Sequence, residues 1–173
     1  MAKVVGESIG EFHHHYPRVP VIVTARSGDK SNAMTAAWHS SISFKPPLYG
    51  VSISPMKFTY RLIIESKEFG INFVPFGLVE LVAAVGSSTG GELDKFQKFA
   101  IAQDKPFRTH VPILKDAYAA YECKLLEYRT YGDHVWFVGE ILAVHFVEEA
   151  FTPEQVIDLN QVQPALYLGA DYY

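Results

Sequence analysis

One run of the chain alternates apolar and small polar side chains in a way that could hold a flat ligand. It covers residues 32–44 and reads Asn-Ala-Met-Thr-Ala-Ala-Trp-His-Ser-Ser-Ile-Ser-Phe. If the run forms one strand, successive side chains point to opposite faces. One face then carries the apolar set Met34, Ala36, Trp38, Ile42 and Phe44, and the other carries Thr35, Ala37, His39, Ser41 and Ser43. The polar face has no Lys, Glu or Arg and could let a ring approach the backbone, although alternation alone favours a strand half exposed to water.

A second group of residues has the chemistry of a phosphate site. Ser54, Lys57 and Thr59 lie around the expected start of a helix, near Pro55 or with Thr59 as its cap. Free amide groups, hydroxyls and an ammonium are what a phosphate monoester requires. A capped helix with a surface lysine explains the same residues and is the more common situation.

Two further groups contain residue types that could do chemistry. His134 follows Gly132-Asp133, and its unperturbed pKa of about 6.5 would let it donate to a substrate; a simple turn histidine is the alternative. Adjacent residues of the triplet His13-His14-His15 point to opposite faces, and no nearby carboxylate or cysteine completes a ligand set. We therefore expect no metal site.

Composition narrows the class of protein. The chain has 173 residues and a formal charge of −4, with no basic run for nucleic acid. We expect one domain over residues 1–173, no signal peptide and no membrane span. The single cysteine, Cys123, cannot form an internal disulfide, which indicates a reducing compartment, the cytoplasm. We interpret Cys123 as a small core residue.

The elements that must position these residues are mostly strands. Short runs rich in β-branched and aromatic residues predict strands over residues 19–25, 33–44, 48–54, 69–74, 118–128 and 134–147. Helical spacing is convincing only around residues 78–85 and 58–66, with a short turn over 93–99. The pattern predicts a mainly β barrel or sandwich with a few short helices inserted.

Several of these segments together resemble one known family. The segments Asn32-Ala-Met-Thr-Ala-Ala-Trp, Pro46-Pro-Leu, Phe58-Thr-Tyr, Ser66-Lys-Glu-Phe-Gly-Ile-Asn-Phe and Gly132-Asp-His are similar, in this order and spacing, to the flavin reductase-like proteins that bind flavin mononucleotide (FMN). Pro20-Val-Ile-Val-Thr, Asp94-Lys-Phe and Tyr167-Leu-Gly-Ala add to the resemblance, which covers residues 16–170.

The resemblance implies a Greek-key split β-barrel that forms a homodimer with FMN at the subunit interface. It implies that residues 32–40 follow the flavin ring and ribityl chain, that residues 52–59 help to hold the phosphate, and that His134 lies near the nicotinamide as the catalytic residue. The cofactor-binding residues expected in this way are Asn32, Ala33, Met34, Thr35, Trp38, His39, Ser40, Ser52, Ser54, Lys57, Thr59 and Asn72.

Two functions remain open at this point. The first is an oxidoreductase that takes hydride from NADH or NADPH and passes it through FMN to free flavin, a ferric chelate or a partner such as a monooxygenase. The second is a non-enzymatic FMN protein that carries electrons. In either case the flavin does the redox chemistry, and the protein binds and orients it.

Overall fold

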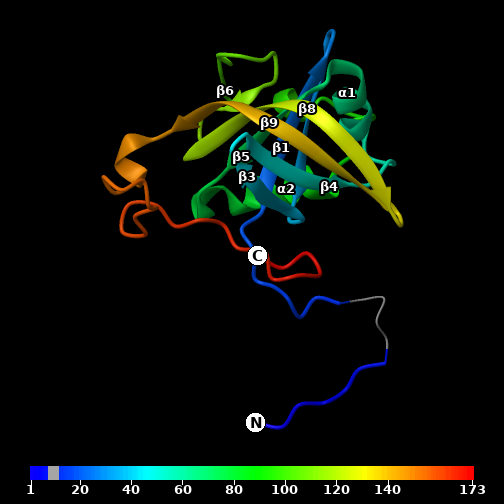
Figure 1. Cartoon of the computed structure of the whole chain (residues 1–173), viewed down its shortest axis with the longest axis vertical. Helices are drawn as coiled ribbons and strands as arrows, with labels where there is room; N and C mark the ends of the chain where they lie inside the picture. The colour runs from blue at the N-terminus through cyan, green and yellow to red at the C-terminus, as the bar shows by residue number, and fades with distance from the viewer. Residues whose placement is uncertain (8–11) are drawn as a thin grey trace.

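A computed structural model describes residues 1–7 and 12–173 and consists mainly of strands (Figure 1). The strands are β1 (Val21–Ser27), β2 (Lys30–Ala36), β3 (His39–Phe44), β4 (Pro47–Ile53), β5 (Glu68–Phe73), β6 (Gln103–Asp104), β7 (Ile113–Leu114), β8 (Ala119–Tyr131) and β9 (His134–Phe146). The helices are α1 (Phe58–Ser66), η1 (Phe76–Leu78), α2 (Val79–Ser87), α3 (Lys95–Lys98) and η2 (Glu148–Ala150). The prediction of a mainly β fold with short inserted helices is confirmed.

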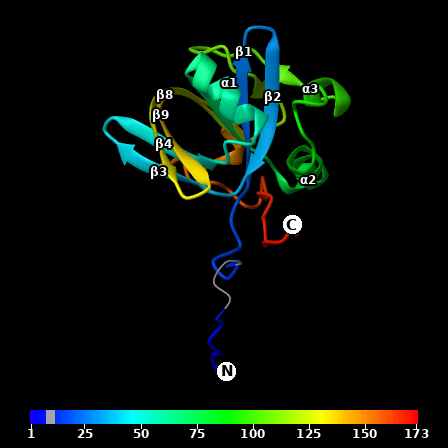
Figure 2. The same ribbon diagram turned by 90° about the vertical axis from the view of Figure 1, so that its right-hand side faces the viewer.

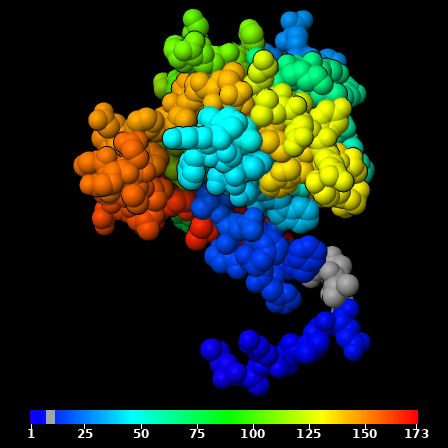
Figure 3. Space-filling model, viewed as in Figure 1, coloured from blue at the N-terminus to red at the C-terminus, as the bar shows by residue number. Residues whose placement is uncertain are grey.

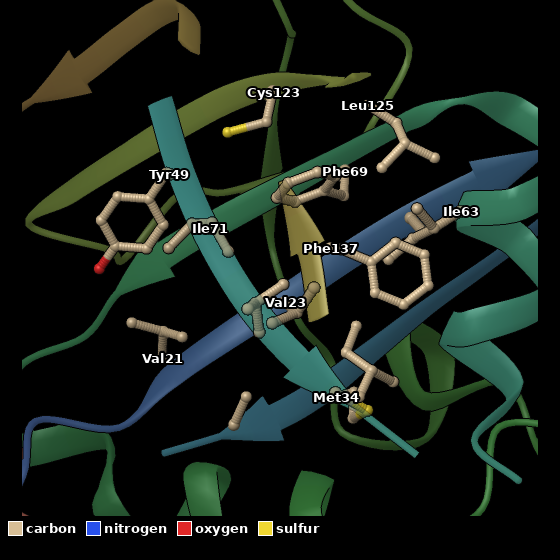
Figure 4. Packing of buried hydrophobic residues seen from close by; sticks show 14 of the residues in the cluster. Val21, Val23, Met34, Tyr49, Ile63, Phe69, Ile71, Cys123, Leu125 and Phe137 are labelled. Carbon is tan, nitrogen blue, oxygen red and sulfur yellow. The ribbon is translucent and has the colours of Figure 1, made fainter. Parts of the chain in front are cut away.

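Seven strands form one antiparallel sheet in the order β2-β1-β5-β8-β9-β4-β3. The sheet curls around the main core, because one cluster of buried residues collects side chains from β1, β2, β4, β5, β8 and β9. Figure 4 shows this packing, with Phe69 and Phe137 at its centre and the Cys123 thiol at its edge. Cys123 is fully buried, as predicted, and burial raises the pKa of its thiol.

The run predicted as one strand over residues 33–44 is two strands, and the prediction was wrong there. β2 pairs with β1, and β3 pairs with β4, so the chain changes partner at the two residues between them. Trp38 marks the break, and its carbonyl accepts a hydrogen bond from the Ser52 amide over 2.8 Å. A further register shift interrupts β3 after Ser41. The shared apolar face therefore ends at Ala36, and Phe44 is 92% exposed.

Two layers of helix cover the β1–β2 end of the sheet (Figure 2). Leu62 and Ile63 of α1 lie inside the barrel core. Val82 and Val85 of α2 pack on the opposite side, in a second cluster with Ala33. The helix around residues 58–66 was predicted correctly, but its cap was not. Lys57 is the N-cap residue and makes no side-chain cap bond, because an ammonium has no acceptor, and Thr59 lies buried within the first turn.

A buried carboxylate holds the loop that precedes β7. Glu122 on β8 is 0% exposed and accepts hydrogen bonds from the amides of Phe107, Arg108 and Thr109, from the Thr109 hydroxyl and from His145 Nε2. Burial opposes ionisation of this carboxyl group, but the bonds from Phe107, His145, Thr109 and Arg108 outweigh it and lower the pKa to about 2. The loop is thus tied to the sheet by one ionised side chain.

In the described parts of the chain, no helix is both long and apolar enough to cross a bilayer.

Candidate functional site

A cleft of about 670 Å³ opens beside the junction between β2 and β3. Its size lies within the range of ligand pockets in proteins. Strand residues form its floor, α2 forms one wall, and the segments near both chain ends form the outer wall. The lining residues are His13, Tyr16, Met34, Thr35, Ala36, Ala37, Trp38, Ser52, Ile53, Ser54, Lys57, Ala83, Ala84, Gly86, Ser87, His134, Tyr167, Asp171 and Tyr173.

The floor of the cleft is flat because its side chains are small or turned away. Met34 and Ala36 point into the barrel core, so they present mainly backbone to the cleft. The Thr35 hydroxyl donates to the Val82 carbonyl over 2.6 Å, which fastens β2 to α2. Ala83 and Ala84 of α2 face the same space. A planar ligand could therefore lie against the backbone of β2.

One inner corner of the cleft is cationic. Lys57 lines it at the start of α1. Lys95 lies behind it, is only 2% exposed, and donates from Nζ to the Val85 carbonyl over 2.7 Å. Burial, with a smaller contribution from the Lys57 charge, lowers the pKa of Lys95 to about 8. Two ammonium groups whose charges interact in this way would both be stabilised by an anion placed between them.

The same region contains a buried acceptor without a partner. Asn32 donates from Nδ2 to the Thr59 hydroxyl over 2.8 Å, but among the described residues its Oδ1 has no hydrogen-bond donor. Gly90 lies directly against this oxygen, and a Cβ atom at position 90 would collide with it. Buried polar atoms are nearly always satisfied. Asn32 does not line the cleft, so this oxygen is left to accept from a small donor such as a water molecule.

The rim of the cleft carries an aromatic pair. The Trp38 ring lies 4.9 Å from the His134 ring at an interplanar angle of 48°. Trp38 Nε1 donates to the Tyr16 hydroxyl over 3.0 Å, which fixes the orientation of the indole. His134 Nδ1 donates to Asp133 over 2.8 Å, and among the described residues its Nε2 has no partner. That bond and the imidazole charge lower the pKa of Asp133. The free Nε2 is placed to reach a molecule that enters the cleft.

The outer wall comes from the two ends of the chain. Arg18 and Tyr167 exchange backbone hydrogen bonds of 3.0 and 2.8 Å, so the N-terminal arm and the C-terminal tail lie side by side. Tyr16 meets Tyr167 edge to face at 4.9 Å. Figure 3 shows red atoms of the tail beside the blue N-terminal arm below the barrel. Tyr16 and Asp171 were not among the predicted site residues, since aromatic and acidic residues near a chain end have no local spacing signal.

The structure brings together about half of the predicted residues. The predicted residues that line the cleft are Met34, Thr35, Trp38, Ser52, Ser54, Lys57 and His134. Lys95 was missed as a site residue, although it lies within the Asp94-Lys-Phe segment. Asp94 caps α3 through a bond from the Gln97 amide, and this cap helps to place Lys95 inside.

The other predicted residues lie outside the cleft lining, and several have other partners. Ala33 packs under α2, and Asn32 and Thr59 bond each other behind the cationic corner. Asn72 is fully buried and satisfied, because it donates to the Ile22 carbonyl and accepts from the Leu114 amide.

His39 and Ser40 belong to β3 and do not line the cleft. His39 Nε2 donates to the Val19 carbonyl, and its Nδ1 lies 2.7 Å from the Tyr49 hydroxyl. Burial lowers the pKa of His39, against the opposing effect of the bond to Val19, so the ring is neutral and accepts from Tyr49.

The triplet at His13, His14 and His15 gathers no metal ligands. Among the residues that the structure describes, no group of three or more His, Cys, Asp or Glu side chains could hold a metal ion. His13 instead packs against Tyr16, with ring centroids 6.1 Å apart.

Known proteins with similar sequences or structures identify the family to which this chain belongs. The model of the flavin reductase-like domain matches residues 13–173. The structure superimposes on an FMN-binding protein from Thermus thermophilus with bound 1-cyclohex-2-enone, with a TM-score of 0.88 and 38% identity, covering 100% of this chain and 94% of that one. A protein from Pyrococcus abyssi is 35% identical over 79% of this chain and 78% of its own length. The reductase component of an FADH2-dependent resorcinol hydroxylase from a Rhizobium species is 23% identical over 97% of this chain and 86% of its own. The chain therefore belongs to the flavin reductase-like domain family.

Proposed function

We propose that this protein is an FMN-dependent oxidoreductase that takes hydride from NADH or NADPH. The observation that carries the proposal is the cleft, in which a flat floor leads from a cationic corner to a histidine with a free nitrogen at the rim. The FMN-binding relative and the reductase component among the relatives support it. We also propose that residues 1–173 form a single domain and that the protein works in the cytoplasm.

The residues of the cleft fit FMN. Lys57, Lys95 and the free amide groups at the start of α1 would hold the phosphate. The backbone of β2 would support the ring, because Met34, Thr35 and Ala36 line the cleft there. Bound there, FMN would supply the ring that accepts hydride. Stacking a nicotinamide on such a ring requires the reacting atoms to lie roughly 3–3.5 Å apart, which an open cleft rim permits.

His134 would position the nicotinamide. Asp133 holds Nδ1 and thereby fixes the proton distribution on the ring, which leaves Nε2 to bond to the incoming dinucleotide. Trp38 buttresses the imidazole from one side, and Tyr16 holds Trp38. This chain of contacts orients His134 without using it to retain the cofactor.

Replacing His134 tests whether this residue positions the nicotinamide or retains FMN. We expect His134→Ala to keep FMN affinity while kcat/KM for nicotinamide oxidation falls by about ten- to a hundredfold, because one charge-assisted hydrogen bond is lost. Fluorescence titration measures the affinity, and loss of nicotinamide absorbance measures the rate. Equal losses in both would place His134 in the cofactor site, and no change in either would leave it as a turn histidine.

We also propose that the active unit is a homodimer. Apolar side chains are exposed on β3 and β9, which flank β4 in the sheet and lie on one face of the molecule (Figure 3). They are Ile42, Phe44, Leu142, Val144 and Phe146. An apolar area of this kind is typical of subunit interfaces.

Sedimentation at micromolar concentration should therefore give twice the mass of one chain. Phe44→Lys, placed in the exposed apolar group, should shift the mass toward that of one chain, whereas Val4→Lys in the exposed N-terminal segment should not. A monomer that still binds FMN tightly would contradict the homodimer.

A further inference from the structure

The charges that line the cleft are unevenly distributed. Among the side chains of the described lining residues, Lys57 is the one ammonium and Asp171 the one carboxylate. Lys57 lies at the start of α1, whereas Asp171 lies on the outer wall with Tyr167 and Tyr173. His13 and His134 are the other lining side chains with ring nitrogens. Among the described lining residues, the outer wall therefore carries one carboxylate side chain and no lysine or arginine.

The backbone around Asp171 has an unusual conformation that fixes the position of this residue. Gly169, Ala170 and Asp171 have φ values of 100°, 47° and 61°, all in the left-handed region. Ala is unfavourable there, so the surrounding structure must enforce this turn. The Tyr172 amide donates to the Gly169 carbonyl over 3.0 Å, and the Asp171 amide donates to the Tyr167 hydroxyl over 3.3 Å.

The N-terminal arm supports the same turn from outside. A Cβ atom at position 169 would come within 3.0 Å of Tyr16 and 3.1 Å of His13, so the two segments are in close contact. The field of the Asp171 carboxylate reaches its neighbours, since burial and then the charges of Tyr167 and Asp171 raise the pKa of Tyr173. Strained residues held in this way are often found where a protein binds a ligand.

We propose that Asp171 determines the choice of nicotinamide and selects NADH over NADPH. The inference rests on the proposed function, because it concerns the dinucleotide that enters the same cleft. The two compounds differ only at the adenosine ribose, which carries a 2′-hydroxyl in NADH and a 2′-phosphate in NADPH. A carboxylate accepts a hydrogen bond from the hydroxyl, but it repels the phosphate dianion.

The cleft also lacks what a 2′-phosphate would need. Recognition of a phosphate normally uses Arg or Lys. With Lys57 engaged by the FMN phosphate, the described lining residues offer no second ammonium or guanidinium. Arg129, on the neighbouring hairpin, is not a lining residue, and its guanidinium carbon lies 5.5 Å from the centre of the Tyr131 ring.

The test compares the two nicotinamides on the FMN-loaded protein at one fixed pH. We expect kcat/KM to favour NADH by at least about tenfold. Asp171→Asn keeps the side-chain shape and tolerates the left-handed backbone, and it should lower the NADH to NADPH ratio by about tenfold, mostly by raising kcat/KM for NADPH. Asp171→Lys should lower the ratio further. Asp29→Asn, at the turn between β1 and β2 and away from the cleft, is the matched control and should leave the ratio unchanged.

Two results would overturn the inference alone. The wild-type protein could use NADPH as well as NADH, or the ratio could stay constant in both Asp171 variants while FMN affinity is retained. Oxidation of neither nicotinamide by the wild-type protein would instead refute the proposed function and, with it, this inference.

Discussion

Glu122→Gln should lower the free energy of unfolding by about 3–5 kcal/mol, the range expected when a buried ionic network loses one partner. The carboxylate accepts bonds of 2.6–2.8 Å from Phe107, Arg108, Thr109 and His145. Gln offers one acceptor oxygen, and its NH2 group would face donors that now lack a partner. Urea unfolding of the apo protein measures the change. Glu65→Gln on the surface of α1 should have a small effect, because the Arg61–Glu65 pair is exposed.

The pH dependence of stability gives the same prediction a second readout. The folded pKa of Glu122 is lowered to about 2, below its ordinary value of about 4.3 in the unfolded chain. The ionised group therefore stabilises the fold above about pH 4.3, and this stabilisation is lost as the pH falls toward 2. Glu122→Gln should be less sensitive than the wild type to pH over that interval. If the variant is as stable as the wild type, the loop is not held by this carboxylate.

The double substitution Lys57→Met with Lys95→Met should weaken FMN binding by about 10²-fold, because it removes one charge-assisted contact of about 1.5–3 kcal/mol and the second positive charge behind it. Riboflavin has no phosphate, so its affinity should change little and serves as the matched ligand control. The apo form should keep its stability to within about 1 kcal/mol, because Met fills a similar volume in place of a buried ammonium. Equal losses for FMN and riboflavin would mean that the phosphate binds elsewhere.

The lowered pKa of Lys95 predicts how FMN affinity depends on pH. Without ligand, the pKa of Lys95 is about 8, and a phosphate beside it would raise that pKa. Binding therefore takes up a proton above about pH 8, and the affinity should fall there by up to about tenfold per pH unit. At about pH 7 and just below, where Lys95 is charged with and without ligand, the affinity should be nearly constant. Lys95→Met should remove the dependence.

Most of the secondary structure could be predicted from local sequence. Strands β5, β8 and β9 and helix α1 were predicted to within a few residues, since their apolar spacing and their flanking breaks agree. The single strand over residues 33–44 was wrong because alternation continues through the Ala37-Trp38 junction, and only pairing with β4 interrupts it. A change of strand partner depends on long-range contacts that no short window contains.

The site was predictable where its residues share a segment. Trp38 and His134 lie in family-like runs, Ser54 and Lys57 lie at the expected start of a helix, and the structure brings all four to one cleft. Lys95 escaped prediction as a site residue because its burial against α2 depends on packing between segments far apart in the sequence. Tyr16 and Asp171 escaped for the same reason, since their place on the wall depends on pairing of the two chain ends.

Anaerobic mixing of the purified protein with excess free FMN and NADH, and in a parallel run NADPH, tests the central proposal most directly. We predict that the FMN-loaded protein is bleached first and that bleaching of the free flavin then continues over many equivalents of protein, with one NADH oxidised per flavin reduced. Reduction that stops after one equivalent of bound FMN would instead indicate an electron carrier. Protein that binds FMN without being reduced by either nicotinamide would contradict the proposed function.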